Sequence, residues 1–422
     1  MSKRIVLTTF GSFGDINPYL AITLGLKERG HRPVLATSEF YRSRIEGMGV
    51  EFHPVRPDID LEDIDAIRRI MHEWKGPQVL VREYLLPHLY DSYNDLLEVA
   101  RDADLILTHP ITYAGPIVAE KYNIPWASAV IAPISLFSAY DPPIFPGTPW
   151  ITGFARLGPA AGRIVLDLSR LYTRHWMKPL YRFRRELGLA RGQNPIFEGQ
   201  YSPYMVLALF PEVLAGPQPD WPPNTIVCGY PFLEEIHDEW RMPEGLHQFL
   251  EDGPQPIVFT LGSSAVVEAG AFYSESFEVA RSLGSRAILL TGPVEENVPQ
   301  KPHSDDVFVC QFAPYSKLFP RCRAVVSSAG MGTISEGLRA GRPMLFATYS
   351  HDQPDNADHV RRLGMSEYIN RRLYNAKRAI PLLEKLLDEG VRAKAEEIGI
   401  RVSSEDGVGA ACGALEKLLN EA

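Results

Sequence analysis

The segment "RIVLTTFGSFGDINPYLAITLGLKERGH" (4–31) holds a strand, a turn and a helix in immediate succession. Its first residues are mostly apolar or β-branched, which indicates a short strand buried on both faces. The turn "GSFGD" follows, after which Asn17 and Pro18 are suited to begin a helix and Gly30 to end it. Ligands of α/β sheets bind where strands give way to helices, so Asp15 stands in an expected ligand-binding turn.

The same alternation of strand and helix continues on both sides of a Pro- and Gly-rich segment (214–232). The expected strands before it are "RPVLATS" (32–38), "DLILTHP" (104–110) and "PWASAVIAP" (125–133), with a helix near 113–122. Those after it are "PIVFTLGSS" (256–264), "RAILLTG" (286–292), "DVFVCQF" (306–312), "RAVVSSAG" (323–330) and "RPMLFATYS" (342–350), with helices near 270–283, 331–340 and 354–363. This pattern predicts the α/β class, with parallel sheets that carry helices on both faces.

The chain has 422 residues and a net charge of −9. Its length predicts two domains of about 200 residues each, and its acidic balance argues against a nucleic-acid partner. The four cysteines, Cys228, Cys310, Cys322 and Cys412, form no CxxC pattern, which argues against a zinc site or a disulfide framework. Neither a signal peptide nor a bilayer-spanning segment is expected, so we predict a cytoplasmic protein.

The two halves share one construction plan, which predicts two facing α/β domains with a cleft between them. We expect an N-terminal domain at 1–215, a linker at 216–232, a C-terminal domain at 233–400 and a last helical segment at 401–422.

One region of the N-terminal half departs from this plan. The Pro-, Gly- and aromatic-rich segment 139–154 is expected to be a loop of defined shape, and the segment 162–187 is expected to be helical, basic and aromatic. Two interpretations of 162–187 remain open. One is a packed helix with a solvated Arg and Lys face; the other is a surface that touches a membrane or an amphiphilic substrate.

Three strand ends in the second half carry small or polar residues. "SSAGMGTISEGLRAG" (327–341) places a glycine-containing turn before a helix, where free backbone N–H groups and the helix dipole favour an anion such as a diphosphate. "LGSS" (261–264) and "HDQPDNA" (351–357) end two further strands, and the three ends are expected to form one pocket. There Asp352 and Gln353 either bind sugar hydroxyls or cap a helix.

The chain resembles the glycosyltransferases of the GT-B fold, in the superfamily that uses nucleotide sugars to glycosylate small lipophilic acceptors. It is similar to the bacterial branch with rhamnolipid rhamnosyltransferases, antibiotic-aglycone glycosyltransferases and sterol glucosyltransferases. The motifs that carry the resemblance are "GSFGDINP" (11–18), "FTLGSS" (259–264) and "SSAGMGTISEGLRAGRPMLFATYSHDQPDNA" (327–357). The resemblance covers nearly the whole chain. It implies two Rossmann-like domains, with the acceptor held by the first and the nucleotide sugar by the second, and a last helix (405–419) that crosses back to the first domain.

In many relatives a catalytic His or Asp stands where Asp15 stands. The resemblance therefore implies that Asp15 removes the proton of an acceptor hydroxyl as that hydroxyl attacks the anomeric carbon, opposite the departing diphosphate. The other interpretation of Asp15 is a cap at the helix start. His109, in "LTHPITYAG", stands near the place where plant relatives have an Asp that orients the base. It steadies Asp15, or is itself the base with Asp15 holding its tautomer, or only bonds to loop backbone.

The phosphate turn departs from the family pattern, because relatives usually begin it with a His and this chain has Ser327-Ser328. Serine donates a hydrogen bond but carries no positive charge, so a slow, altered or inactive enzyme stays an open alternative. Glu336 matches the family Glu that binds both ribose hydroxyls, which favours a UDP-sugar over a dTDP-sugar. Phe312 either stacks on the nucleotide base or belongs to the core. The other expected donor-binding residues are Gly14, Gly262, Ser263, Ala313, Gly330, Gly332 and Thr333.

The sequence thus predicts an inverting glycosyltransferase that moves a hexose from a UDP-sugar to a hydroxyl of a lipophilic small molecule, without a metal ion or other cofactor. The expected acceptor-binding residues are Phe13, Trp74, His88, Phe137, Tyr140 and Trp150. The alternatives are a UDP-sugar epimerase of similar fold and a nucleotide-sugar-binding protein whose chemistry was lost with the His. Peripheral membrane contact stays open, and the oligomeric state does not follow from the sequence.

Overall fold

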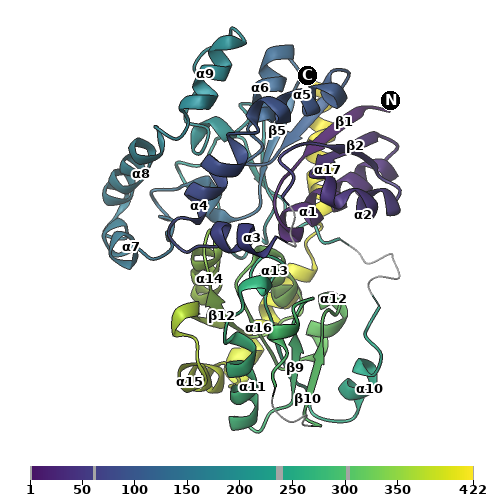
Figure 1. Ribbon diagram of the computed structural model, residues 1–422, viewed down its shortest axis with the longest axis vertical. Helices are drawn as coiled ribbons and strands as arrows, with labels where there is room; N and C mark the ends of the chain where they lie inside the picture. The colour runs from purple at the N-terminus through teal and green to yellow at the C-terminus, as the bar shows by residue number, and fades with distance from the viewer. Residues whose placement is uncertain (1, 60–62, 234–240, 301–304, 422) are drawn as a thin grey trace. The chain divides into compact units, whose positions relative to one another are not determined.

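The computed structural model describes residues 2–59, 63–233, 241–300 and 305–421. The chain divides into two compact units. Unit 1 comprises Met1–Ile70, Trp74–Glu234 and Asp406–Ala422, and unit 2 comprises Met71–Glu73 and Glu235–Glu405. Each unit is built on its own parallel sheet with helices packed against it (Figure 1), so the α/β class predicted from the sequence is confirmed.

The sheet of unit 1 has seven strands in the described part of the chain, in the order β3-β2-β1-β4-β5-β6-β7. The strands are β1 (Arg4–Thr8), β2 (Arg32–Thr37), β3 (Glu51–Pro54), β4 (Leu105–Thr108), β5 (Trp126–Val130), β6 (Val206–Ala208) and β7 (Thr225–Val227), and every pair is parallel. In β1, Ile5, Val6 and Leu7 are fully buried, as expected of a central strand covered on both faces. The strand order reverses between β1 and β4, and such a switch point is where α/β sheets bind ligands.

The helices of unit 1 are α1 (Phe13–Glu28), α2 (Arg42–Gly47), α3 (Ile64–Ile70), α4 (Gly76–Val79), α5 (Leu89–Ala100), α6 (Ala114–Tyr122), α7 (Pro149–Ala155), α8 (Pro159–Thr173), α9 (Lys178–Glu186) and α17 (Gly407–Glu421). The C-terminal helix α17 lies along α1 (Figure 1), although nearly the whole chain separates them in sequence. The approach is close, because a Cβ built on Gly25 would lie 2.6 Å from a methyl carbon of Val408. Glu416 adds an ion pair to Arg29 (2.8 Å) on the rim of this contact.

The sheet of unit 2 repeats the arrangement with six strands in the described residues, in the order β10-β9-β8-β11-β12-β13. They are β8 (Ile257–Thr260), β9 (Ala287–Leu290), β10 (Val307–Cys310), β11 (Ala324–Ser327), β12 (Met344–Thr348) and β13 (Ser366–Asn370), all paired in parallel. The helices are α10 (Leu246–Glu251), α11 (Phe272–Ser282), α12 (Tyr315–Leu318), α13 (Met331–Arg339), α14 (Gln353–Arg362), α15 (Ala376–Leu386) and α16 (Glu389–Ser403). Here the order reverses between β8 and β11, which gives unit 2 a switch point of its own.

Three local expectations need correction. Helix α1 begins at Phe13 with Ser12 as its N-cap, so Asn17 does not begin it and Pro18 lies inside it. The expected linker 216–232 contains β7, whose pairing with β6 makes it part of the unit 1 sheet. The basic segment 162–187 forms parts of two helices, α8 and α9, rather than one.

The domain boundaries also differ from those expected. Unit 1 continues to residue 234, where the undescribed stretch 234–240 begins, and the expected start of the second domain at 233 adjoins that stretch. At the other end, α16 belongs to unit 2, and the chain returns to unit 1 at Asp406 rather than at 401.

All four cysteines are free thiols. Burial raises the pKa of each to about 12, so they are protonated at neutral pH. Among the described residues, no helix combines the length and the apolar character needed to cross a bilayer.

Candidate active site

The turn between β1 and α1 holds a carboxylate in a defined position. Ser12 caps the helix by accepting a hydrogen bond from Gly14 N (3.3 Å), and the Ser12 N–H donates to Asp15 Oδ2 (2.7 Å), which completes a capping box. Gly11 has a φ of +138°, and a Cβ built on it would lie 2.2 Å from Asp15 Oδ2. Glycine is therefore required at position 11, because the carboxylate lies directly over its Cα. Sequence reasoning did not single out Gly11, although the "GSFGD" turn contains the signal.

His109 follows β4, the neighbour of β1 across the switch point, and its side chain faces Asp15. The distance between His109 Nε2 and Asp15 Oδ1 is 3.5 Å. The imidazole is buried edge-on against the ring of Tyr19, with centroids 5.8 Å apart. Its Nδ1 has no hydrogen-bond partner among the described residues. The loop is held instead by the main chain of His109, whose N–H donates to Thr112 Oγ1 (3.0 Å), so the imidazole itself is not bonded to loop backbone.

The two members of this pair differ in access to solvent. The side chain of Asp15 is 33% exposed and that of His109 is 7% exposed. Two tyrosines hold the turns that carry them: Tyr41 donates to Gly11 O (2.8 Å) and Tyr19 donates to Thr108 O (2.9 Å). Burial, reinforced by the negative charge of Asp15, raises the pKa of both phenols above its ordinary value, which keeps them protonated as donors.

The turn between β11 and α13 in unit 2 is built differently. Ser327 and Ser328 are buried, and the hydroxyl of Ser327 accepts a weak hydrogen bond from Ala329 N (3.4 Å). Ala329 has a φ of +68°, a strained conformation for a residue with a side chain. Gly330 is the N-cap of α13 and makes no side-chain cap, and a Cβ built on it would meet no atom within 4 Å. The first turn of α13 therefore presents N–H groups that no capping side chain occupies.

Two contacts join this turn to its neighbours. Gly262 N, after β8, donates weakly to Ser328 Oγ (3.4 Å). Asn356, in α14 after β12, donates through Nδ2 to Ala329 O (3.2 Å) and to Asp352 Oδ2 (2.7 Å). The ends of β8, β11 and β12 therefore meet. These are the three strand ends that were expected to form one pocket. Asn356 lies within the quoted "HDQPDNA" segment but was not among the expected site residues.

Asp352 and Gln353 take distinct positions at the start of α14. Asp352 occupies the N-cap position but makes no capping hydrogen bond; its carboxylate accepts from Asn356 instead. Gln353 is buried, and its Oε1 accepts from Tyr349 N (2.9 Å). His351, just before them, has a φ of +54°, a second strained residue at this edge of the sheet.

Several of the residues expected around the nucleotide lie on α13 and on the segment before α12. Glu336 is paired with Arg339 at 2.8 Å. Tyr315, which the sequence did not indicate, bonds through its phenol to Thr260 Oγ1 (2.8 Å) and also to Thr333. Burial raises the pKa of Tyr315, and the negative charge of Glu336 adds to the shift, so the phenol is a protonated group beside this carboxylate. The side chain of Phe312 is 45% exposed, so Phe312 is not a core residue, whereas Ala313 is buried. Gly14 lies in the first turn of α1 and Gly332 in the first turn of α13. Ser263 follows β8.

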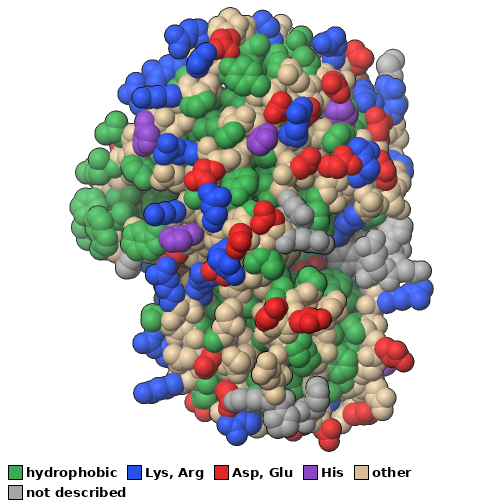
Figure 2. Space-filling view, in the orientation of Figure 1, with side chains coloured by type: hydrophobic (Ala, Val, Ile, Leu, Met, Phe, Trp, Pro, Cys, Tyr) green, Lys and Arg blue, Asp and Glu red, His purple; other side chains and the backbone are tan. Residues whose placement is uncertain are grey.

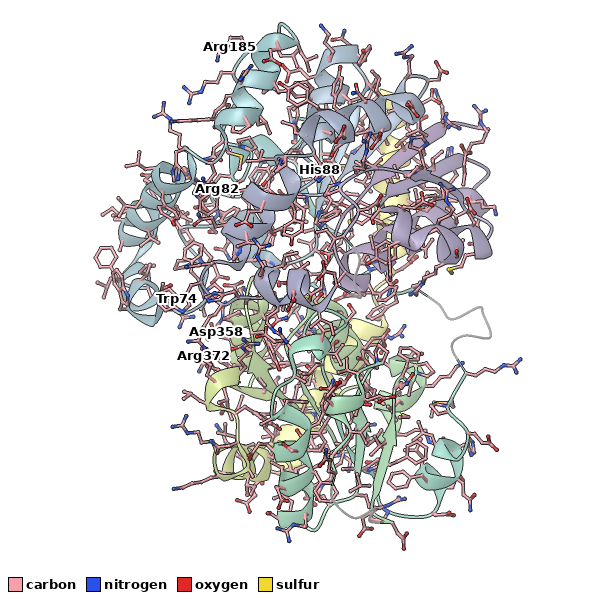
Figure 3. The ribbon with its side chains drawn as sticks, viewed as in Figure 1. Trp74, Arg82, His88, Arg185, Asp358 and Arg372 are labelled. Carbon is pink, nitrogen blue, oxygen red and sulfur yellow. The ribbon has the colours of Figure 1, made fainter. Side chains whose placement is uncertain are left out.

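The expected acceptor-binding residues have different surroundings in the structure. Phe13 lies beside the Asp15 turn, edge-on to Tyr41 (5.4 Å between centroids), and Phe137 packs against Phe197 (4.5 Å). His88 is paired with Asp91 at the start of α5, and Figure 3 shows it well apart from Trp74. Three of the six, Trp74, Tyr140 and Trp150, are exposed large aromatics. A single acceptor pocket lined by all six stays a prediction.

The model of the glycosyltransferase family 28 N-terminal domain matches residues 5–140, and the model of the UDP-glucoronosyl and UDP-glucosyl transferases matches residues 240–394. An O-mycaminosyltylonolide 6-deoxyallosyltransferase from Streptomyces fradiae is 30% identical over 98% of this chain and 97% of that protein. The chain belongs to the GT-B glycosyltransferases.

More distant relatives agree with this assignment. A sterol 3-beta-glucosyltransferase from Neosartorya fischeri is 28% identical over the whole of this chain, which spans 30% of that longer protein. Among solved structures, the glycosyltransferase VinC in complex with DTDP has a TM-score of 0.70 at 18% identity, over 99% of this chain and 100% of VinC. The spinosyn rhamnosyltransferase SpnG has a TM-score of 0.69 at 15% identity, over 100% of both chains. These two structures support the fold, so the predicted GT-B architecture of this glycosyltransferase is confirmed.

Proposed function

We propose that this glycosyltransferase transfers a hexose from a nucleotide diphosphate sugar to a hydroxyl group of a lipophilic small molecule, with inversion at the anomeric carbon and with Asp15 as the general base. The observation that carries the proposal is the Asp15–His109 pair at the switch point of unit 1. It joins a partly exposed carboxylate to a buried imidazole on two neighbouring strand ends. The sterol and macrolide relatives support a lipophilic acceptor.

The choice of Asp15 over His109 as base rests on exposure and on atom positions. A base has to reach the acceptor proton directly or through one water. The Nε2 atom of His109 is directed at Asp15, its Nδ1 is buried, and the side chain is only 7% exposed. His109 is therefore the positioning residue: its Nε2–H faces Asp15 Oδ1, while Ser12 holds Oδ2. Asp15 also caps α1, so both interpretations of this residue apply together.

The reaction follows from these roles. The acceptor oxygen forms a bond to the anomeric carbon while the bond from that carbon to the diphosphate oxygen breaks, and the diphosphate leaves with the electron pair. The acceptor proton passes to Asp15, which later releases it to water. Attack from the face opposite the leaving group inverts the anomeric configuration.

For the donor, we propose that the uncapped first turn of α13 binds the diphosphate. Its N–H groups and the positive end of the helix dipole favour an anion, and the open space at Gly330 permits close approach. We assign the stacking of the nucleotide base to the exposed ring of Phe312. This arrangement needs no metal ion, so a chelator is expected to leave turnover unchanged.

Different observations favour different nucleotides in the donor. Glu336 supports a UDP-sugar, as does the match to the UDP-glucoronosyl and UDP-glucosyl transferase model. Against this, VinC was solved with DTDP, and Glu336 is already paired with Arg339. We propose UDP, with Glu336 exchanging part of its bonding to Arg339 for the ribose hydroxyls.

One experiment tests the proposal as a whole. The purified enzyme is incubated with UDP- and dTDP-sugars and with sterol, macrolide, phenolic and hydroxy-fatty-acid acceptors, and nucleotide release, product mass and anomeric configuration are measured. An inverted glycoside formed only with acceptor present is the expected result. Epimerised sugar without acceptor would point to the epimerase alternative, and nucleotide binding without turnover would mean that the chemistry was lost with the family His. A retained configuration would contradict direct displacement.

A further inference from the structure

Helices α7 and α8 of unit 1 carry an exposed apolar surface, of which only Trp150 was among the expected acceptor-binding residues. We use the name α7–α8 face for a group of exposed residues, which are Trp150, Leu157, Ile164, Leu168, Leu171 and Tyr172. Trp150 is 73% exposed, Leu157 78% and Leu168 61%. Figure 2 shows the corresponding cluster of hydrophobic side chains on the left of the view, where Figure 1 places α7 and α8. Apolar patches of this kind on a folded protein mark interaction sites.

The face follows from the helical periodicity of α8. Ile164, Leu168 and Leu171 are spaced four and three residues apart, so they form one stripe along the helix. A second side of the helix is buried in unit 1, through residues that include Val165 and Leu166. The expectation of a packed helix with a solvated Arg and Lys face therefore covers only part of α8, because a third side is both apolar and exposed.

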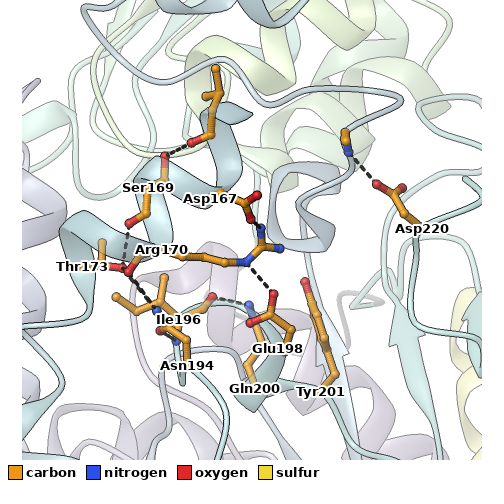
Figure 4. A network of polar contacts seen from close by, with 12 residues as sticks. Asp167, Ser169, Arg170, Thr173, Asn194, Ile196, Glu198, Gln200, Tyr201 and Asp220 are labelled. Carbon is orange, nitrogen blue, oxygen red and sulfur yellow. Dashed lines mark hydrogen bonds and ion pairs between the residues drawn. The ribbon is translucent and has the colours of Figure 1, made fainter. Parts of the chain in front are cut away.

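The exposed stripe belongs to a firmly held helix. Arg170 Nε donates to Glu198 Oε1 (2.6 Å), which joins α8 to a later segment of unit 1 within the polar network of Figure 4. At the other end of the helix, a Cβ built on Gly162 would lie 2.5 Å from Ala139 O, so α8 is in direct backbone contact there. The apolar stripe is thus presented in a fixed orientation.

The charge around this surface is opposite in sign to that of the whole protein. Residues 150–191 contain nine Lys and Arg residues against Asp167 and Glu186, although the full chain has a net charge of −9. Several of these cations are exposed, among them Arg163 on α8 and Arg174, the C-cap residue of α8. Positions 163 and 174 lie beside the apolar stripe on the helix circumference, so cationic and apolar sides adjoin along α8.

We propose that the α7–α8 face docks on an anionic lipid surface. An apolar stripe bordered by Arg side chains fits the boundary between acyl chains and phosphate headgroups, where the apolar groups leave water and the guanidinium groups meet phosphates. Trp150 and Tyr172 have the amphipathic rings that favour this boundary. A second copy of the chain is a poorer occupant, because a symmetric contact through this face would bring two basic segments together. The inference is independent of the proposed reaction.

The test is sedimentation of the full chain with sucrose-loaded vesicles. The vesicles are phosphatidylcholine alone or phosphatidylcholine with about one-third phosphatidylglycerol, at low and high salt. We expect binding to the anionic vesicles that weakens at high salt. The triple variant Leu157→Ser, Leu168→Ser, Leu171→Ser should bind these vesicles at least about tenfold more weakly than the unmodified chain. The double variant Arg163→Gln, Arg174→Gln should bind them about fivefold more weakly for each Arg removed.

The matched control is Ile400→Ser, an equally exposed apolar residue on α16 of unit 2, which should bind like the unmodified chain. All the substituted side chains are exposed, so the thermal unfolding temperatures of the variants should equal that of the unmodified chain. This measurement separates lost docking from lost folding. Absence of vesicle binding by the unmodified chain overturns the proposal, as does a triple variant that binds as well as Ile400→Ser. A self-association in ultracentrifugation that the triple variant abolishes, without lipid binding, overturns it in favour of a second copy.

Discussion

The turn after β1 in unit 1 and the turn after β11 in unit 2 each lie at a point where strand order reverses, and each leads into a helix. They differ in what occupies the helix start. Ser12 and Asp15 cap α1 with their own side chains, whereas Gly330 leaves the first turn of α13 without a side-chain cap. The capped turn has used its donors and offers a carboxylate, and the uncapped turn offers donors to an anion. Under the proposed function, one strand–turn–helix plan serves a base in one unit and a diphosphate in the other.

The largest effect is expected from Asp15→Asn in the capped turn. Asn keeps the shape and an oxygen that can accept from Ser12 N, but it cannot take the acceptor proton. Turnover should fall by about a hundredfold to ten-thousandfold, while nucleotide affinity and the unfolding temperature barely change. Steady-state rates, titration calorimetry and thermal melts measure the three quantities. Near-normal turnover would reduce Asp15 to a capping residue.

The second prediction adds a charge to the uncapped turn. Ser328→His restores the type of residue that relatives have there and should raise turnover by about tenfold to a thousandfold if a cation on the leaving group is what this turn lacks. Ser327 still belongs to β11, one residue before the turn, so Ser327→His should give no gain and serves as the comparison. Equal turnover of Ser328→His and the unmodified enzyme would mean that another group already supplies the charge.

The third prediction concerns the nucleotide that the uncapped turn accepts. Glu336→Leu should weaken UDP binding by about 1.5–3 kcal/mol, the usual cost of losing charge-assisted hydrogen bonds, and should weaken dTDP much less. Calorimetric titration of both nucleotides measures the difference. Arg339→Leu removes the cation that Glu336 is paired with and should not reproduce this selectivity. Equal losses for both nucleotides would show that Glu336 does not bind the ribose.

The smallest effects come from exchanging the caps themselves. Gly330→Asn adds an uncharged cap to α13, which should compete with the diphosphate and weaken nucleotide binding by about fivefold, or ~1 kcal/mol, while leaving stability equal or slightly higher. Ser12→Ala removes the cap of α1 and should cost about 0.5–2 kcal/mol of stability without changing nucleotide affinity. If Gly330→Asn binds nucleotide normally, the start of α13 is not the diphosphate site.

Much of the fold was predictable because buried parallel strands leave a strong local signal. The apolar runs of β1, β4, β8 and β11 identified the strands that flank both switch points, and the residues just after them identified the turns. Strands β3, β6, β7 and β13 were missed. β3, β7 and β13 lie at sheet edges and are only partly buried, so they carry no continuous apolar run, and β6 has only three residues. β7 also lies in a Pro-rich segment that suggested a linker.

The start of α1 was placed too late because Pro18 is a familiar first-turn residue, whereas the capping box of Ser12 and Asp15 places the N-cap five residues before Asn17. Other features of the site depend on tertiary contact. The distance from Asp15 to His109 appears only when β1 and β4 lie side by side. The requirement for Gly11, by contrast, arises within the turn itself, from the Asp15 carboxylate four residues later. The exposed stripe on α8 likewise depends on which side of the helix unit 1 covers.

The most direct test of the account is a double-mutant cycle on turnover with Asp15→Asn, His109→Ala and the combined variant. If Asp15 is the base and His109 positions it, Asp15→Asn loses most of the turnover and adding His109→Ala costs little more, because both act in one proton transfer. Nucleotide affinity should be the same in all three variants. If Asp15→Asn keeps near-normal turnover while His109→Ala loses it, or if the two losses multiply in full, the capped turn does not hold the base as described.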